Sequence, residues 1–147
     1  MASTSSSALN MLLDLASEEA ELAAKDLAAA NKALKEEQEK NTMLDSYKQS
    51  YVAHLNMQLA TGLGKETHLN YQQFLQNLQQ AIDGQADAII AAEYERDNKR
   101  EVLQTGQRKK MSYEVLIKRA KKKAMQIENK RDQKMMDEFA MRVKRRG

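Results

Sequence analysis

Apolar residues recur at alternating spacings of three and four along residues 9–58. This spacing is the heptad pattern of a helix that packs one apolar seam against a partner helix. Four of the fifteen seam positions are polar: Glu37, Asn41, Lys48 and Gln58. The eleven apolar positions are Leu9, Leu13, Ala16, Ala20, Ala23, Leu27, Ala30, Leu34, Leu44, Tyr51 and Leu55. The pattern predicts one long helix over about residues 8–60.

A second seam with the same spacing runs from Tyr71 to Ile127, and twelve of its seventeen positions are apolar. It predicts a second helix over about residues 67–143. Between the two patterns lies the sequence TGLGKETH, residues 61–68, which holds two of the five glycines in the chain. Because glycine pairs of this kind interrupt helices, we predict the turn at about residues 61–66.

Two long helices joined by a short turn run antiparallel. We therefore predict an all-α fold, a long antiparallel two-helix coiled coil or helical hairpin, as a single domain of residues 1–147. The C-terminal helix is the longer one. A turn at this place makes the numbers of facing residues sum to about 130. That register sets Leu55 near Leu75 and Glu37 near Arg96, so that polar positions of the two seams meet.

The composition supports long helices and excludes several kinds of chemistry. The chain has no proline, cysteine or tryptophan, and its plentiful Ala, Leu, Lys, Glu, Gln and Met are good helix formers. The two histidines, His54 and His68, flank the turn without the further ligands that a metal site needs. GLGKET lacks the residues of a phosphate-binding loop. We expect no catalytic residues, no metal and no cofactor. We also expect no signal peptide and no membrane span.

Charge is divided unevenly along the chain. Residues 1–95 hold 6 basic and 14 acidic residues, a net charge of −8, and residues 96–147 hold 18 basic and 7 acidic residues, a net charge of +11. Pairing of the acidic helix with the basic one accounts for most of this asymmetry. A second interpretation stays open for the basic run KRAKKKA, residues 118–124. In it the run binds an anionic surface, which is a protein, lipid headgroups or RNA. Nucleic acid is not expected, because interleaved aromatic residues are missing.

One stretch, residues 67–82, carries no charge at all. It includes NYQQFLQNLQQAI, residues 70–82. Phe74 in this stretch, like Tyr47 on the first helix, lies off the seams. An uncharged surface with off-seam aromatic residues suits docking, because no charge has to be buried. Beyond about residue 122 the second helix has no partner, so Met135, Met136 and Phe139 are expected to be exposed.

NYQQFLQNLQQAI, the terminal ENKRDQKMMDEFAMR at residues 128–142 and the tyrosine spacing of YKQSY at residues 47–51 resemble the FliJ family of flagellar type III export. The resemblance implies a stalk-like, non-enzymatic accessory subunit in the cytoplasm, peripheral at the cytoplasmic face of the inner membrane. Its implied partners are the hexameric export ATPase and its regulator, the membrane export gate and the export chaperones. The resemblance further implies that such a subunit promotes assembly of the ATPase ring, escorts the chaperones and reaches the membrane only through its partners.

The resemblance also implies an export-gate-binding patch, whose residues here are Leu44, Tyr47, Tyr51, Phe74, Leu78 and Ala81. For the ATPase or its regulator, the expected contacts are Arg131, Lys134, Met135, Met136, Phe139 and Arg142, because apolar residues without a partner helix stand there among basic ones. Two other functions stay open on the sequence: a generic coiled-coil adaptor, and a basic hairpin that binds RNA or anionic membrane.

Overall fold

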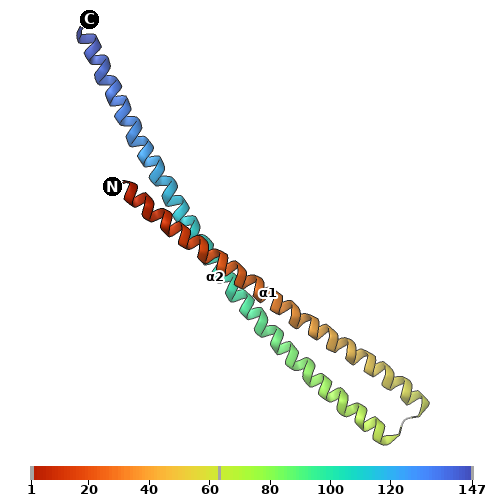
Figure 1. Cartoon of the computed structure of the whole chain (residues 1–147). Helices are drawn as coiled ribbons and strands as arrows, with labels where there is room; N and C mark the ends of the chain where they lie inside the picture. Colours follow the sequence, from red (N-terminus) through yellow and green to blue (C-terminus); the bar gives the residue numbers. More distant parts are fainter. Residues whose placement is uncertain (1, 63, 147) are drawn as a thin grey trace. The chain divides into compact units, whose positions relative to one another are not determined.

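The computed structural model describes residues 2–62 and 64–146, with side chains from residue 6 onward. It contains two α-helices, α1 (Ala2–Thr61, 60 residues) and α2 (Lys65–Arg146, 82 residues), which run antiparallel (Figure 1). No strand occurs in the described ranges. The predicted all-α hairpin with a longer second helix is confirmed. Both helices begin earlier than predicted, and α2 also extends past residue 143.

The chain divides into two units, each of which holds a part of both helices. Unit 1 comprises Met1–Leu22 with Leu103–Gly147, and unit 2 comprises Ala23–Val102 with the turn between the helices. Within each unit the segments of α1 and α2 pack on each other through the seam. That the whole chain forms a single coiled-coil domain stays a prediction.

The buried side chains of both units lie on the predicted seams. The buried apolar residues are Ala16, Ala20, Ala23, Ala30, Leu34, Leu55, Leu78 and Ile117. All fifteen predicted positions of the first seam are buried or half-buried. On the second seam the same holds from Tyr71 to Ile117, whereas Ala120, Ala124 and Ile127 are exposed. The heptad pattern therefore identified the packing face, and the paired part of α2 ends a little before the predicted residue 122.

The register between the helices differs from the predicted one by about one helical turn. In unit 2 Lys48 Nζ donates to Gln79 Oε1 at 2.7 Å, and the rings of Tyr51 and Phe74 stack with centroids 4.1 Å apart. The predicted contact of Glu37 with Arg96 is wrong, since Glu37 pairs with Gln85, a different seam position of α2. Residues 62–64 separate the helices, fewer than the six that were predicted, and the polar contacts Glu37–Gln85 and Lys48–Gln79 specify the register.

Gly62 ends α1 in a left-handed conformation, with φ of 92°. Its N–H donates to the carbonyl of Leu59 at 3.4 Å, and the hydroxyl of Thr61 donates to the carbonyl of Gln58 at 3.0 Å. These two bonds satisfy carbonyls at the end of α1 that have no partner within the helix. The turn is therefore short because glycine allows the chain to reverse at once.

Gly62→Ala should lower the stability of the hairpin by about 1 kcal/mol, because a β-carbon disfavours the left-handed conformation by roughly that amount. Thermal unfolding followed by circular dichroism measures the change. Gly84→Ala is the matched control, since Gly84 lies inside α2 with open space around the added β-carbon. That control should be neutral or stabilising, because alanine favours a helix more than glycine does. Equal destabilisation by both substitutions would contradict the turn geometry.

Candidate functional site

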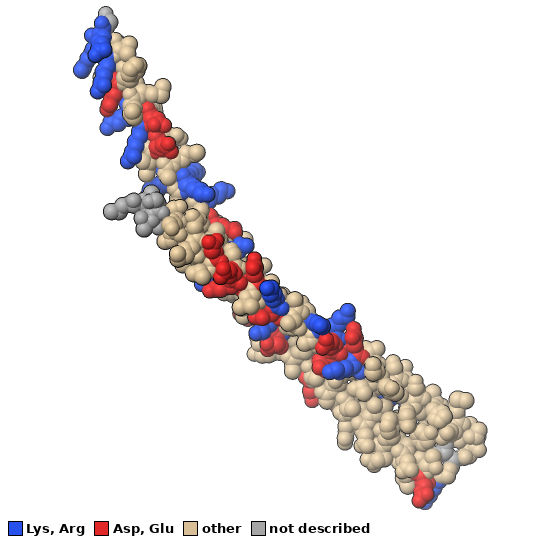
Figure 2. All heavy atoms as spheres, in the orientation of Figure 1, with Lys and Arg blue, Asp and Glu red and all other residues tan. Residues whose placement is uncertain are grey.

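The turn-proximal part of unit 2 carries almost no charge on either helix. We call residues 47–62 and 64–82 the tip surface. Its charged residues are Lys48, which bonds to Gln79, and Lys65 and Glu66 at the start of α2. Figure 2 shows this region as nearly continuous uncharged surface, in contrast to the mixed charges along the remaining helices. The uncharged stretch marked in the sequence covers only the α2 half of this surface, although the predicted gate patch includes Tyr47 and Tyr51 of the first helix. The same count of charges would have found the uncharged residues 49–62 of the α1 half.

An aromatic cluster lies at the centre of the tip surface. Tyr51 of α1 stacks on Phe74 of α2, and its ring also lies 5.5 Å from that of Tyr71 in a tilted arrangement. A shallow hollow of about 260 Å³ opens beside these rings and is lined by Tyr51, Thr67, Asn70, Tyr71 and Phe74. The cluster holds the two helices together near the turn and presents ring surface with amide and hydroxyl groups at the same place.

The six residues of the predicted export-gate patch all lie in unit 2, and the structure divides them by exposure. Leu78 is buried, and Leu44 and Tyr51 are half-buried. Tyr47 is 58% exposed and Phe74 is 40% exposed. Ala81 is exposed as well. The Tyr51–Phe74 contact brings the α1 and α2 parts of the patch together. That Tyr47 and Phe74 lie close to one another stays a prediction.

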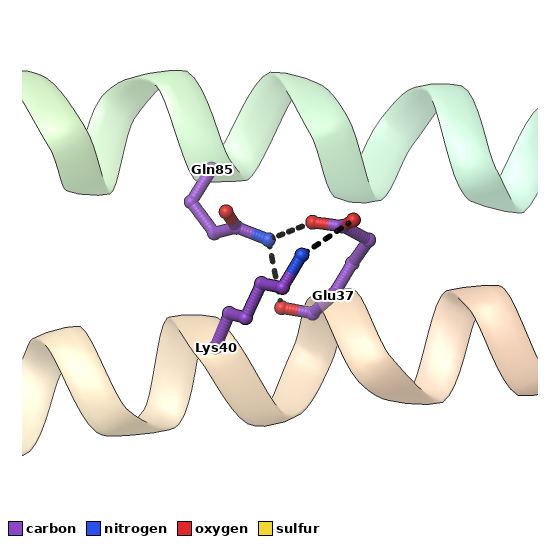
Figure 3. A network of polar contacts seen from close by, with 3 residues as sticks. All are labelled: Glu37, Lys40 and Gln85. Atoms are coloured by element: carbon purple, nitrogen blue, oxygen red, sulfur yellow. Dashed lines mark hydrogen bonds and ion pairs between the residues drawn. The ribbon is translucent and has the colours of Figure 1, made fainter.

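Polar contacts replace apolar packing on the seam below the tip surface. The side-chain amide of Gln85 donates to the carboxylate of Glu37 and, at 2.9 Å, to its backbone carbonyl (Figure 3). Lys40 Nζ lies 3.4 Å from the same carboxylate. Glu37 and Gln85 are both predicted seam positions, so the expectation that polar seam residues meet is confirmed with a different partner. Polar pairs within a seam specify the register of the helices.

The hydrogen bond from Gln85 lowers the pKa of the Glu37 carboxyl below its usual value, and Lys40 acts in the same direction. A lowered pKa in the folded state stabilises the hairpin where the carboxylate is charged. This contribution is present above the ordinary carboxyl pKa and is lost as the pH falls through the lowered value. The contact therefore holds the register at neutral pH and weakens in acid.

The C-terminal part of α2 forms the second candidate surface. Residues 118–146, which we call the overhang, are all exposed. Met135, Met136 and Phe139 are exposed at 68, 72 and 69%, as predicted. Arg131, Lys134 and Arg142 are exposed beside them. Figure 2 shows basic side chains along this end of α2. The overhang therefore presents apolar side chains within a basic helix.

The two histidines of the chain lie near the turn. A ring nitrogen of His54 lies 3.1 Å from the side-chain amide of Gln58, and Nδ1 of His68 is buried without a hydrogen-bond partner. In the part of the chain that the structure describes, no three His, Cys, Asp or Glu residues cluster in a way that would hold a metal ion. Over the same residues, neither helix has an apolar stretch long enough to cross a membrane.

This architecture defines the class of antiparallel two-helix coiled coils. The sequence model of the flagellar FliJ protein family matches residues 5–147. The chain is 31% identical over 136 residues to the flagellar FliJ protein of Salmonella typhi, and 32% identical over 136 residues to that of Escherichia coli strain K12. Both alignments cover 92% of this chain and 92% of the relative. The chain belongs to the FliJ family and is thus an accessory protein of flagellar export, with a part in flagellum biogenesis.

Proposed function

We propose that the chain is a non-enzymatic subunit that acts by binding the export ATPase through the overhang and the membrane export gate through the tip surface. The observation that carries the proposal is the presence of two exposed surfaces of different chemistry, one in each unit. The tip surface is uncharged and aromatic, and the overhang is basic with exposed methionines and a phenylalanine. Membership of the FliJ family supports the assignment of these surfaces to the flagellar export machinery.

The tip surface suits a partner that must release again. An uncharged face buries no unpaired charge when it docks, so the cost of removing water from it is small. Exposed aromatic rings such as Tyr47 supply contact area with few rotatable bonds, and such residues dominate the binding energy at many interfaces. The hollow beside Phe74 offers space for one apolar side chain of the partner. These properties support the tip surface as the part that contacts the export gate.

The overhang suits a partner that encloses a single helix. Three of its exposed apolar residues, Met135, Met136 and Phe139, lie within one and a half turns, so they share one side of α2. Methionine side chains adapt to irregular surfaces, and the surrounding basic residues steer an acidic partner into place. We infer that the overhang contacts the ATPase hexamer or its regulator, promotes ring assembly there, and leaves the hairpin free to escort export chaperones. The subunit is cytoplasmic and reaches the inner membrane through these partners.

The direct test is reconstitution with a purified flagellar export ATPase and the cytoplasmic part of the export gate. ATP hydrolysis and the hexamer fraction should rise when the chain is added at equal concentration. A pull-down of the gate should retain the chain, and neither RNA nor anionic vesicles should compete for it at physiological salt. The proposal is wrong if the chain changes neither hydrolysis nor assembly and binds vesicles or RNA instead, with affinity that falls steeply as salt rises.

A further inference from the structure

Unit 1 has apolar surface that neither the seam nor the overhang uses. On α2 a shallow groove of about 490 Å³ is lined by Arg108, Met111, Ser112, Val115, Leu116 and Arg119. Intervals of three and four residues place these side chains on one stripe, which faces away from the seam residues Tyr113 and Ile117. Met111 is 62% exposed and Leu116 is 44% exposed.

The α1 segment of unit 1 has a matching stripe. Met11, Leu12, Leu15 and Leu22 are all exposed, with Glu18 between the last two. Their spacing again places them on one side of the helix, and this side faces away from the seam. Each helix of unit 1 thus has a second apolar stripe, and a helix with apolar residues on two sides packs against two neighbours.

The two stripes meet on the same side of the hairpin. Lys109 Nζ of α2 lies 3.6 Å from the carboxylate of Glu19 on α1. Both residues lie next to the seam, so their positions on the two helices face each other. Leu116 lies one heptad after Lys109, and Leu12 lies one heptad before Glu19. In an antiparallel pair such steps keep the register, so Leu12 and Leu116 form the equivalent pair. Together with Leu15 they make one apolar face, which we call the lateral face.

Charges of opposite sign border the two halves of the lateral face. Residues 6–22 of α1 contain four acidic residues and no basic one, and residues 103–123 of α2 contain eight basic residues and one acidic residue. A face of this kind is complementary to itself under a two-fold rotation, which sets the acidic half of one copy on the basic half of the other. Contacts between two copies of α1 would set acid against acid and are disfavoured.

We propose that the lateral face binds a second copy of this chain. Two hairpins pack side by side over unit 1, with α1 of each copy on α2 of the other, as in an antiparallel four-helix bundle. Leu12, Leu15 and Leu116 of both copies form the core of the contact. Glu18 of one copy lies near Arg108 and Arg119 of the other. The tip surface and the overhang take no part, so the association is independent of the proposed partners.

Sedimentation velocity of the full chain at rising concentration tests the contact. The weight-average mass should move from monomer to dimer, and Leu116→Asp or Leu15→Lys should weaken the association by at least ~10-fold, because each sets a new charge against like charges of the other copy. Leu69→Asp is the matched control. Leu69 is an equally accessible leucine, 58% exposed, on the tip surface of unit 2. Unchanged helicity by circular dichroism verifies that each variant is folded.

A charge exchange provides the second arm. Replacing Arg108 and Arg119 together by Glu should weaken the dimer, and adding Glu18→Lys in the same chain should restore it. Three results would overturn the proposal: a monomer at all concentrations up to about 1 mM, loss of association with Leu69→Asp alone, or failure of the exchanged chain to reassociate. If the chain is monomeric and the lateral variants weaken capture of another export protein, the occupant of this face is that protein and the proposed dimer is wrong.

Discussion

Tyr47→Ala is expected to leave the melting temperature unchanged and to weaken binding of the export gate by about 30-fold. Tyr47 is 58% exposed, and truncating an exposed side chain costs within about half a kcal/mol of stability. An aromatic anchor at an interface is worth about 2 kcal/mol or more, which corresponds to that factor in affinity. Thermal melts and titration calorimetry with the cytoplasmic part of the gate measure the two effects separately.

Two further substitutions serve as controls for this result. Leu55→Ala removes a buried side chain of the same region, so it should lower stability by about 2–5 kcal/mol and affect binding only through that loss. Tyr94→Ala removes a tyrosine of unit 2 that is 69% exposed and lies outside the tip surface, so it should change neither property. If Tyr94→Ala weakens binding as much as Tyr47→Ala does, the tip surface is not the docking site.

Phe74→Ala should show a mixture of the two effects. Its ring stacks on Tyr51 at 4.1 Å, and such a pair contributes about 0.5–1.5 kcal/mol beyond the area it buries. The ring is also 40% exposed and borders the hollow. Its replacement should therefore lower the melting temperature slightly and binding substantially. The structure thus makes Tyr47 the cleaner probe of docking, although both residues lie off the predicted seams.

Removal of residues 128–147 is expected to abolish stable binding of the ATPase and to leave unfolding of the hairpin almost unchanged. The last buried side chain of α2 is Ile117, so the removed segment contributes no seam contact to unit 1. A helix without tertiary packing adds little stability of its own. The checks are circular dichroism melts and a pull-down of the ATPase with the full and shortened chains.

A full-length variant separates apolar contact from charge. Replacing Met135, Met136 and Phe139 by Gln keeps the length and all basic residues of the overhang. If apolar contacts anchor the ATPase, this variant should bind as weakly as the shortened chain. Binding that survives the replacement but falls with salt would assign the interaction to the basic residues alone. A loss of hairpin stability on truncation would show that the overhang is part of the core, contrary to this account.

Several features of the fold could be predicted from residue spacing, because one physical cause, the burial of the apolar seams, determines them. The heptad seams decide which side of each helix avoids water, and the structure buries or half-buries every predicted position from Leu9 to Gln58. The pairing of polar Glu37 with a polar seam residue follows from the same cause. The exposure of Met136 and Phe139 followed from the unequal lengths of the two helices.

Other features depend on small differences that spacing does not reveal. The register differs from the predicted one by about a turn because individual contacts such as Glu37 with Gln85 specify it, which no periodicity records. The stacking of Phe74 on Tyr51 depends on that register and on rotamers, so the sequence alone marked Phe74 only as lying off the seam. The apolar stripes of unit 1 are present in the sequence, but Leu116 is recognised as exposed only when it is known which residues pack in the seam.

The most direct test of the two-surface account is hydrogen exchange of the full chain, followed by mass spectrometry, with each partner added in turn. The gate should slow exchange in peptides of residues 47–82, and the ATPase should slow it in peptides of residues 118–146, because binding suppresses local opening of the contacted segments. Peptides of residues 86–102 should exchange at the same rate in all three samples. Protection by both partners in residues 86–102, or by the gate in the overhang, would contradict the assignment of the two surfaces.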